Sequence, residues 1–66
     1  MKILLNGESY EIGSGTTVAE LLKRLSLRKD QVAVECNRLL VRGAEQERQV
    51  LCEGDRLEVV QFVGGG

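Results

Sequence analysis

The chain has 66 residues with a net charge of -1 and no histidine. A chain this short supports one small core and lacks the walls of a deep substrate cleft. Mixed charges, with Tyr10 and Phe62 as the only aromatic residues, give no field or stacking surface for nucleic acid. Without a histidine to act as a base near neutral pH, we expect a protein that is not an enzyme.

The apolar segments are short. None could span a membrane, and turn residues interrupt the apolar residues after Met1, so no signal peptide is expected. We expect a cytoplasmic protein without a membrane partner.

The two cysteines, Cys36 and Cys52, fit no metal-ligand spacing, so no metal is expected. Cys36 continues the apolar alternation of Val32 and Val34, where a thiol acts as a small buried hydrophobe. Cys52 has no basic neighbour that would keep it ionised, so we expect both thiols to be inert.

The first elements form a hairpin. Residues 2–5 are predicted to form a strand with Ile3 on its apolar face, and residues 9–12 a second strand. Asn6-Gly7 between them suits a tight type I′ turn.

A helix follows the hairpin. Its apolar residues recur at the helical spacing of i, i+3, i+4 and i+7, and they are Val18, Leu21, Leu22 and Leu25. Thr17 and Glu20 have the spacing of a capping box, which marks the start of the helix.

The second half of the chain alternates again. Strands are predicted at residues 31–36, 39–41 and 56–63. Asn37-Arg38 offers the first turn between them, and residues 53–55 offer the last. The polar residues 42–49, with Gly43 inside, indicate a loop that has room for one helical turn.

This order of elements predicts the fold. One helix can cover one face of one small sheet, which makes two layers around a single core. We therefore predict an α+β protein of the β-grasp type, in which a mixed four- to five-stranded sheet packs on one main helix. The last strand should lie beside the first. Residues 1–63 would form this domain, and residues 64–66 a flexible glycine tail.

The tail consists of Gly64, Gly65 and Gly66. Three extended residues reach about 10 Å, and glycines without Cβ atoms can lie in a narrow channel. The carboxylate of Gly66 would be unhindered, but it needs activation by a partner, for instance by adenylation with ATP. The alternative is a frayed terminus without function.

The last strand is apolar on both faces. Leu57 and Val59 face one way, and Val60 and Phe62 the other. Either local loops or Leu40 and Val41 cover the second pair, or the pair forms a partner-binding patch beside the tail. Both alternatives stay open for Val60, whereas we expect Phe62 to be partly exposed.

Five segments together resemble a known family. They are MKILLNG at residues 1–7, TVAELL at 17–22, VAVECN at 32–37, EGD at 53–55 and VQFVGGG at 60–66. Along essentially its whole length the chain resembles the ThiS family of ubiquitin-like sulfur carriers from thiamine biosynthesis.

The resemblance implies a division of labour. A ThiF-type adenylyltransferase would use ATP to adenylate Gly66, and a cysteine desulfurase would supply the sulfur of a C-terminal thiocarboxylate. A ThiG-type thiazole synthase would consume that sulfur. Gly64 and Gly65 would thread the partners' active sites, while Val60, Phe62 and Val63 would dock. No cofactor would be bound permanently, and the free carrier would be a monomer.

Three other functions stay open. The chain could be a MoaD-like carrier that donates sulfur for molybdopterin. It could be a protein modifier that forms isopeptide bonds through Gly66. It could also be a plain β-grasp binding module in which the tail has no role.

Overall fold

The computed structural model describes residues 1–62, and Val63 and the three glycines lie outside this range. The elements are β1 (Lys2–Leu5), β2 (Glu8–Glu11), α1 (Val18–Arg24), a 3₁₀ turn η1 (Lys29–Gln31), β3 (Val32–Cys36), β4 (Leu39–Leu40), α2 (Glu45–Arg48) and β5 (Arg56–Gln61).

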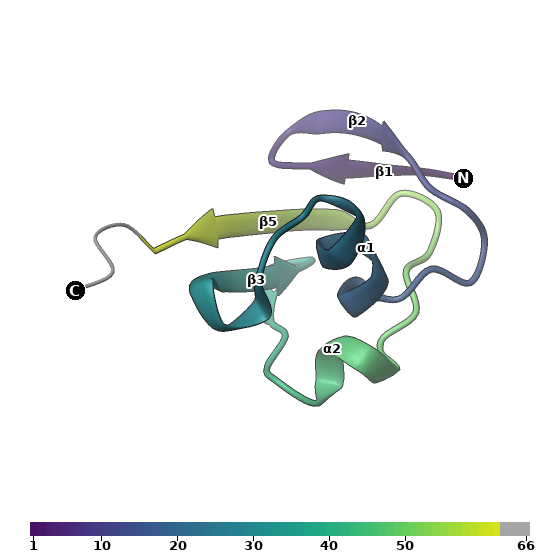
Figure 1. Ribbon diagram of the computed structural model, residues 1–66. Coiled ribbons are helices and arrows are strands. Elements are labelled where there is room, and N and C mark those ends of the chain that lie inside the picture. The colour runs from purple at the N-terminus through teal and green to yellow at the C-terminus, as the bar shows by residue number, and fades with distance from the viewer. Residues whose placement is uncertain (63–66) are drawn as a thin grey trace.

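The five strands form one sheet in the order β2-β1-β5-β3-β4. β1 and β5 are parallel, and the other neighbours are antiparallel. α1 crosses one face of this sheet, and the first and last strands are neighbours (Figure 1). The predicted two-layer β-grasp is confirmed, with five strands.

The first hairpin turns as predicted. Asn6 and Gly7 both have positive φ, +50° and +83°, as a type I′ turn requires. β2 begins at Glu8 and ends at Glu11, one residue earlier than predicted at each end. Ile12 still belongs to the core, since it is 4% exposed and its N–H donates to the Met1 carbonyl at 2.8 Å.

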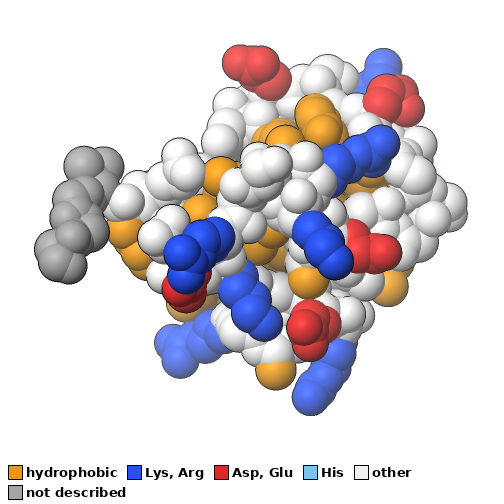
Figure 2. Space-filling view, viewed as in Figure 1, with side chains coloured by type: hydrophobic (Ala, Val, Ile, Leu, Met, Phe, Trp, Pro, Cys, Tyr) orange, Lys and Arg blue, Asp and Glu red, His pale blue; other side chains and the backbone are white. Residues whose placement is uncertain are grey.

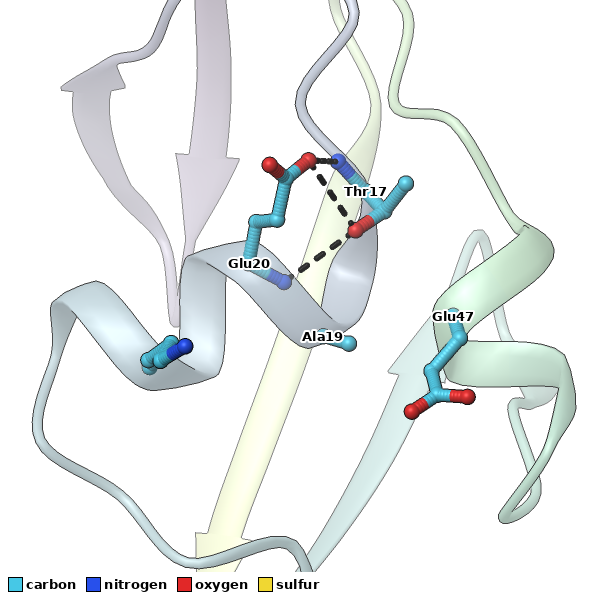
Figure 3. A pocket seen from close by; sticks show the side chains of 5 residues that line it. Thr17, Ala19, Glu20 and Glu47 are labelled. Atoms are coloured by element: carbon cyan, nitrogen blue, oxygen red, sulfur yellow. Dashed lines mark hydrogen bonds between the residues drawn. The ribbon is translucent and has the colours of Figure 1, made fainter.

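α1 is capped at both ends. The hydroxyl of Thr17 accepts from the Glu20 N–H at 3.1 Å, and the Thr17 N–H donates back to the Glu20 carboxylate at 3.0 Å, which confirms the capping box (Figure 3). After the helix, Ser26 has φ +60°, and the Leu27 N–H donates to the Leu22 carbonyl at 2.9 Å. This second pattern is a Schellman motif with serine in the usual glycine position.

Strand boundaries in the second half differ from the expected ones: β4 ends at Leu40 and not at residue 41, and β5 ends at Gln61, so that Phe62 follows the strand. The strand predicted for residues 31–36 begins at Val32, because Gln31 closes the 3₁₀ turn with a hydrogen bond from its N–H to the Arg28 carbonyl at 2.9 Å. The polar stretch 42–49 contains the short helix α2, the helical turn for which the sequence left room.

The core lies between α1 and the sheet. It consists of Ile3, Ile12, Val18, Leu21, Leu22, Val32, Val34, Cys36, Val41, Leu51 and Leu57. Cys36 is 3% exposed, as predicted for a buried filler. Gln46 of α2 is also buried: its amide nitrogen donates to the Val41 carbonyl at 3.2 Å, while its amide oxygen has no partner among residues 1–62. Nothing in the polar pattern of residues 42–49 predicts this inward-facing side chain.

Candidate functional site at the exit of β5

β5 leads toward the glycine tail, and its last residues are apolar on the open face of the sheet. Leu57 is buried and Val59 packs against the core, whereas Val60 is 59% and Phe62 is 62% exposed. The predicted exposure of Phe62 is confirmed, and Val60 is not a core residue. Ala33, half-buried and paired with Val60 across the sheet, adjoins them. We call Ala33, Val60 and Phe62 the outer patch.

The expected alternative cover for the outer patch is wrong. Val41 is buried in the core, and Leu40 is itself 52% exposed at the sheet edge, where it pairs with Glu35. Hydrophobic atoms border the end of the described chain in Figure 2. An exposed apolar surface at this place can bind a partner without any rearrangement of the core.

Charged residues lie beside the outer patch on the same face. Arg56 and Glu58 precede Val60 on β5 and are exposed, and Glu58 pairs with Glu35 of β3. On β3 and β5 the apolar part of this face therefore lies at the end of β5, and Leu40 on the edge strand β4 is a separate exposed apolar residue of the same face.

The segment from Val59 to Phe62, in which β5 ends and the chain leaves the sheet, is called the exit of β5. Hydrogen bonds hold it on both sides. On the β3 side, the Phe62 N–H donates to the Gln31 carbonyl at 2.9 Å. On the β1 side, the Val59 N–H donates to the side-chain oxygen of Asn6 at 2.8 Å, and the Asn6 amide nitrogen donates to the Val59 carbonyl at 3.3 Å. The sequence predicts Asn6 only as a turn residue, because local periodicity carries no information about a contact with a residue 53 positions away.

A second asparagine holds the start of β5. The Arg56 N–H donates to the Asn37 side-chain oxygen at 3.0 Å, and the Asn37 amide donates to the Asp55 carboxylate at 3.1 Å. Asp55 also accepts from the Cys52 N–H at 2.8 Å, which closes the predicted turn at residues 53–55. Asparagine side chains thus bond β5 at its first residue, Arg56, and at Val59, two residues before its end.

The two thiols lie away from the exit. Cys36 pairs with Leu57 near the start of β5, and burial, followed by the nearby charge of Asp55, raises the pKa of its thiol. Cys52 is exposed and precedes the turn that leads into β5. Neither cysteine adjoins the outer patch.

The remaining surface offers no catalytic constellation in the described part of the chain. A shallow groove between α1 and α2 is lined by Thr17, Ala19, Glu20, Lys23 and Glu47 (Figure 3). Glu20 is engaged in the helix cap there. Within residues 1–62 no three or more acidic or cysteine side chains gather as a metal site would require, and no helix is long and apolar enough to cross a membrane.

The structure therefore exposes two of the predicted site residues, Val60 and Phe62, and their spacing of two residues favours the same face of the sheet. Val63 and residues 64–66 lie outside the described residues. The docking and sulfur-carrying roles stay predictions.

Known proteins match this chain along its whole length. A curated relative named thiazole synthase from Magnetococcus marinus is 46% identical over all of the chain, which spans 20% of that relative's length. The sulfur carrier protein ThiS of Escherichia coli is 30% identical, with both proteins covered completely. The crystal structure of thiamine biosynthesis protein ThiS from Geobacter metallireducens superposes with a TM-score of 0.85 at 28% identity and full coverage of both chains. The sequence model described as the ThiS family matches residues 3–66. The chain belongs to the ThiS family.

Proposed function

We propose that this protein is a sulfur carrier of thiamine biosynthesis that holds its sulfur as a thiocarboxylate on Gly66. The observation that carries the proposal is the exposed outer patch at the exit of β5, directly before the glycine tail. The match to the ThiS family extends through the tail to residue 66, which supports the same role.

The chemistry begins with activation. An oxygen of the Gly66 carboxylate attacks the α-phosphorus of ATP, the bond from that phosphorus to the bridging oxygen of the β-phosphate breaks, and pyrophosphate leaves. The carboxyl carbon then carries AMP, a good leaving group. A ThiF-type adenylyltransferase would catalyse this step, because the sequence contains no histidine to act as a base near neutral pH.

Sulfur enters next. The terminal sulfur of a cysteine desulfurase persulfide attacks the acyl carbon, and AMP leaves with the electrons of the broken bond. The acyl disulfide joins the Gly66 carbonyl carbon to the cysteine sulfur of the desulfurase through the transferred sulfur. A thiol then attacks that cysteine sulfur, which forms a new disulfide and releases the transferred sulfur as the thiocarboxylate on Gly66. The carrier acts as a co-substrate and the partners as catalysts.

The consumer of the sulfur is a ThiG-type thiazole synthase. The relative from Magnetococcus marinus is named thiazole synthase and aligns with the whole of this chain over a fifth of its own length, which supports such a partner. Gly64 and Gly65 would lie in the active-site channels of the partners, since glycines present no side chain to the channel walls. The outer patch and Val63 would dock beside them.

Transfer of sulfur to the carrier in vitro, called loading below, tests the proposal. The purified carrier, incubated with its ThiF-type adenylyltransferase, ATP and a cysteine desulfurase with cysteine, should gain the mass difference between sulfur and oxygen. Fragmentation should place this difference on Gly66. A carrier that instead gives slower-migrating conjugates on lysines of other proteins would be a modifier, and the sulfur-carrier proposal would be wrong.

Cysteine substitutions separate tail chemistry from thiol chemistry. Cys52→Ala and the double variant with Cys36→Ala should still load, because both thiols lie away from the exit and the buried Cys36 resists ionisation. The double variant should be less stable, since Cys36 belongs to the core. Labile sulfur found as a persulfide on Cys52 would contradict the mechanism.

Phe62→Ala should weaken binding to the adenylyltransferase or the synthase by at least about tenfold, roughly 1.4 kcal/mol. An exposed aromatic beside the tail has the character of an interface anchor, and truncation of such anchors commonly costs about 2 kcal/mol. The melting temperature should change little, because the side chain is 62% exposed. Titration calorimetry and thermal melting measure the two quantities.

Leu39→Ala is the matched control. Leu39 is 73% exposed but lies on β4 opposite Cys36, near the start of β5. It is five residues along the sheet from the level of Phe62, roughly 16 Å. Loss of affinity in both variants, or a sharp drop in melting temperature with unchanged affinity for Phe62→Ala, would show that Phe62 is not the docking anchor.

A further inference from the structure

β5 extends beyond the strand that supports it on one side. The parallel pairing with β1 covers only Arg56 and Leu57, opposite Leu4 and Leu5. The last backbone hydrogen bond between the two segments runs from the Asn6 N–H to the Leu57 carbonyl at 2.8 Å. At this point the chain turns back into β2, while β5 continues past the turn toward the tail (Figure 1).

The side chain of Asn6 continues the sheet where the backbone of β1 leaves it. Its oxygen accepts from the Val59 N–H at 2.8 Å, and its nitrogen donates to the Val59 carbonyl at 3.3 Å. A carboxamide carries the same donor and acceptor as a peptide unit, so it can replace the next residue of a neighbouring strand. Among residues 1–62, these are the last hydrogen bonds that β5 makes on this side.

We propose that Asn6 is a positioning residue for the carrier terminus: its carboxamide fixes the direction in which β5 leaves the sheet. The proposal rests on the sulfur-carrier function above. Val59 lies only three residues before Phe62, whose N–H bond to the Gln31 carbonyl fixes the opposite side. With both sides held, the segment from Val59 to Phe62 has one orientation relative to the rest of the sheet. A docked partner then meets the segment that precedes the tail in a fixed orientation, which lowers the ordering cost of binding.

The test substitutes glycine for each of the two asparagines that hold β5. Asn6 and Asn37 both have positive φ, +50° and +52°, so glycine is compatible with either turn. Asn6→Gly removes the bonds to Val59 at the exit. Asn37→Gly removes the side-chain bonds to the Arg56 N–H and the Asp55 carboxylate at the start of the same strand, and it is the matched control.

The first readout is adenylation of each carrier by its ThiF-type enzyme, followed as ATP-dependent pyrophosphate release at a temperature where every variant is folded. Asn6→Gly should lower kcat by about tenfold, because a small displacement of a reacting group is costly to rate. Its KM should change less than its kcat, since every side chain of the outer patch is retained. Asn37→Gly should keep both constants, even where it lowers the melting temperature as much or more.

The second readout does not need a partner. Nitrogen-15 relaxation should give lower order parameters for Gln61 and Phe62 in Asn6→Gly than in the wild type or in Asn37→Gly. If Asn6→Gly does not fold, Asn6→Asp replaces it, because aspartate keeps the acceptor for the Val59 N–H but sets an oxygen against the Val59 carbonyl.

Two results would overturn the positioning role: an unchanged kcat for Asn6→Gly, or an equal loss of kcat for both glycine variants. If even the wild type is not adenylated, the proposed function fails. The order parameters alone then test whether Asn6 fixes the end of β5. Equal values in all three proteins would refute this role, and a selective decrease in Asn6→Gly would support it.

Discussion

One alanine added after Gly66 should abolish sulfur loading. The added residue converts the Gly66 carboxylate into a peptide bond, which has no oxygen free to attack ATP. It also moves the new carboxylate about 3.5 Å further from the domain, past the point at which a docked partner would hold it. Intact-mass measurement after incubation with the adenylyltransferase, ATP and the sulfur source should show no gain of sulfur.

Gly66→Ala is the control for this extension. It adds a Cβ at the terminus but keeps the length of the tail and its free carboxylate, so it should retain measurable loading. The two variants therefore distinguish the effect of a longer tail from the effect of an added side chain at position 66. An extended carrier that acquires sulfur as the wild type does would refute the proposal that Gly66 carries it.

Local chemistry explains why the hairpin and the main helix could be predicted. Asn6-Gly7 permits two successive positive φ angles, and Thr17 with Glu20 satisfies the first amides of α1. The information for each of these features lies within a few residues, so the sequence is sufficient to identify them.

Long-range contacts explain what the sequence did not reveal. Gln46 lies in a polar stretch, yet tertiary packing of α2 buries it against the Val41 carbonyl. Leu51 joins the core from a segment without a strand or helix. The bonds of Asn6 to Val59 arise only after β1 and β5 have become neighbours. Periodicity describes the faces of single elements and carries no information about such pairs.

In the candidate site, too, one feature could be predicted from local pattern and another depended on long-range pairing. Strict alternation along β5 was enough to predict that Phe62 faces away from Leu57, and the structure confirms it. Whether Val60 was covered depended on which strand lay beside it. Its partner is the small Ala33, which leaves Val60 exposed, and this pairing could not be derived from β5 alone.

Leu21→Ala should lower the free energy of unfolding by about 2 to 5 kcal/mol. Leu21 is fully buried at the centre of the α1 stripe, between the sheet and the helix. A domain of 66 residues has roughly 3 to 10 kcal/mol in total, so this single change could remove most of its stability. Urea unfolding followed by circular dichroism measures the loss.

Leu25→Ala provides the comparison within the same stripe. Leu25 is the C-cap of α1 and is only partly buried against the core, so its truncation should cost clearly less than that of Leu21. Both leucines lie on the helix-covered face of the sheet, opposite the outer patch. The fraction of Leu21→Ala that remains folded should therefore load sulfur at the wild-type rate. Folded Leu21→Ala protein with a selective loss of loading would mean that α1 contributes to partner binding as well as to the core.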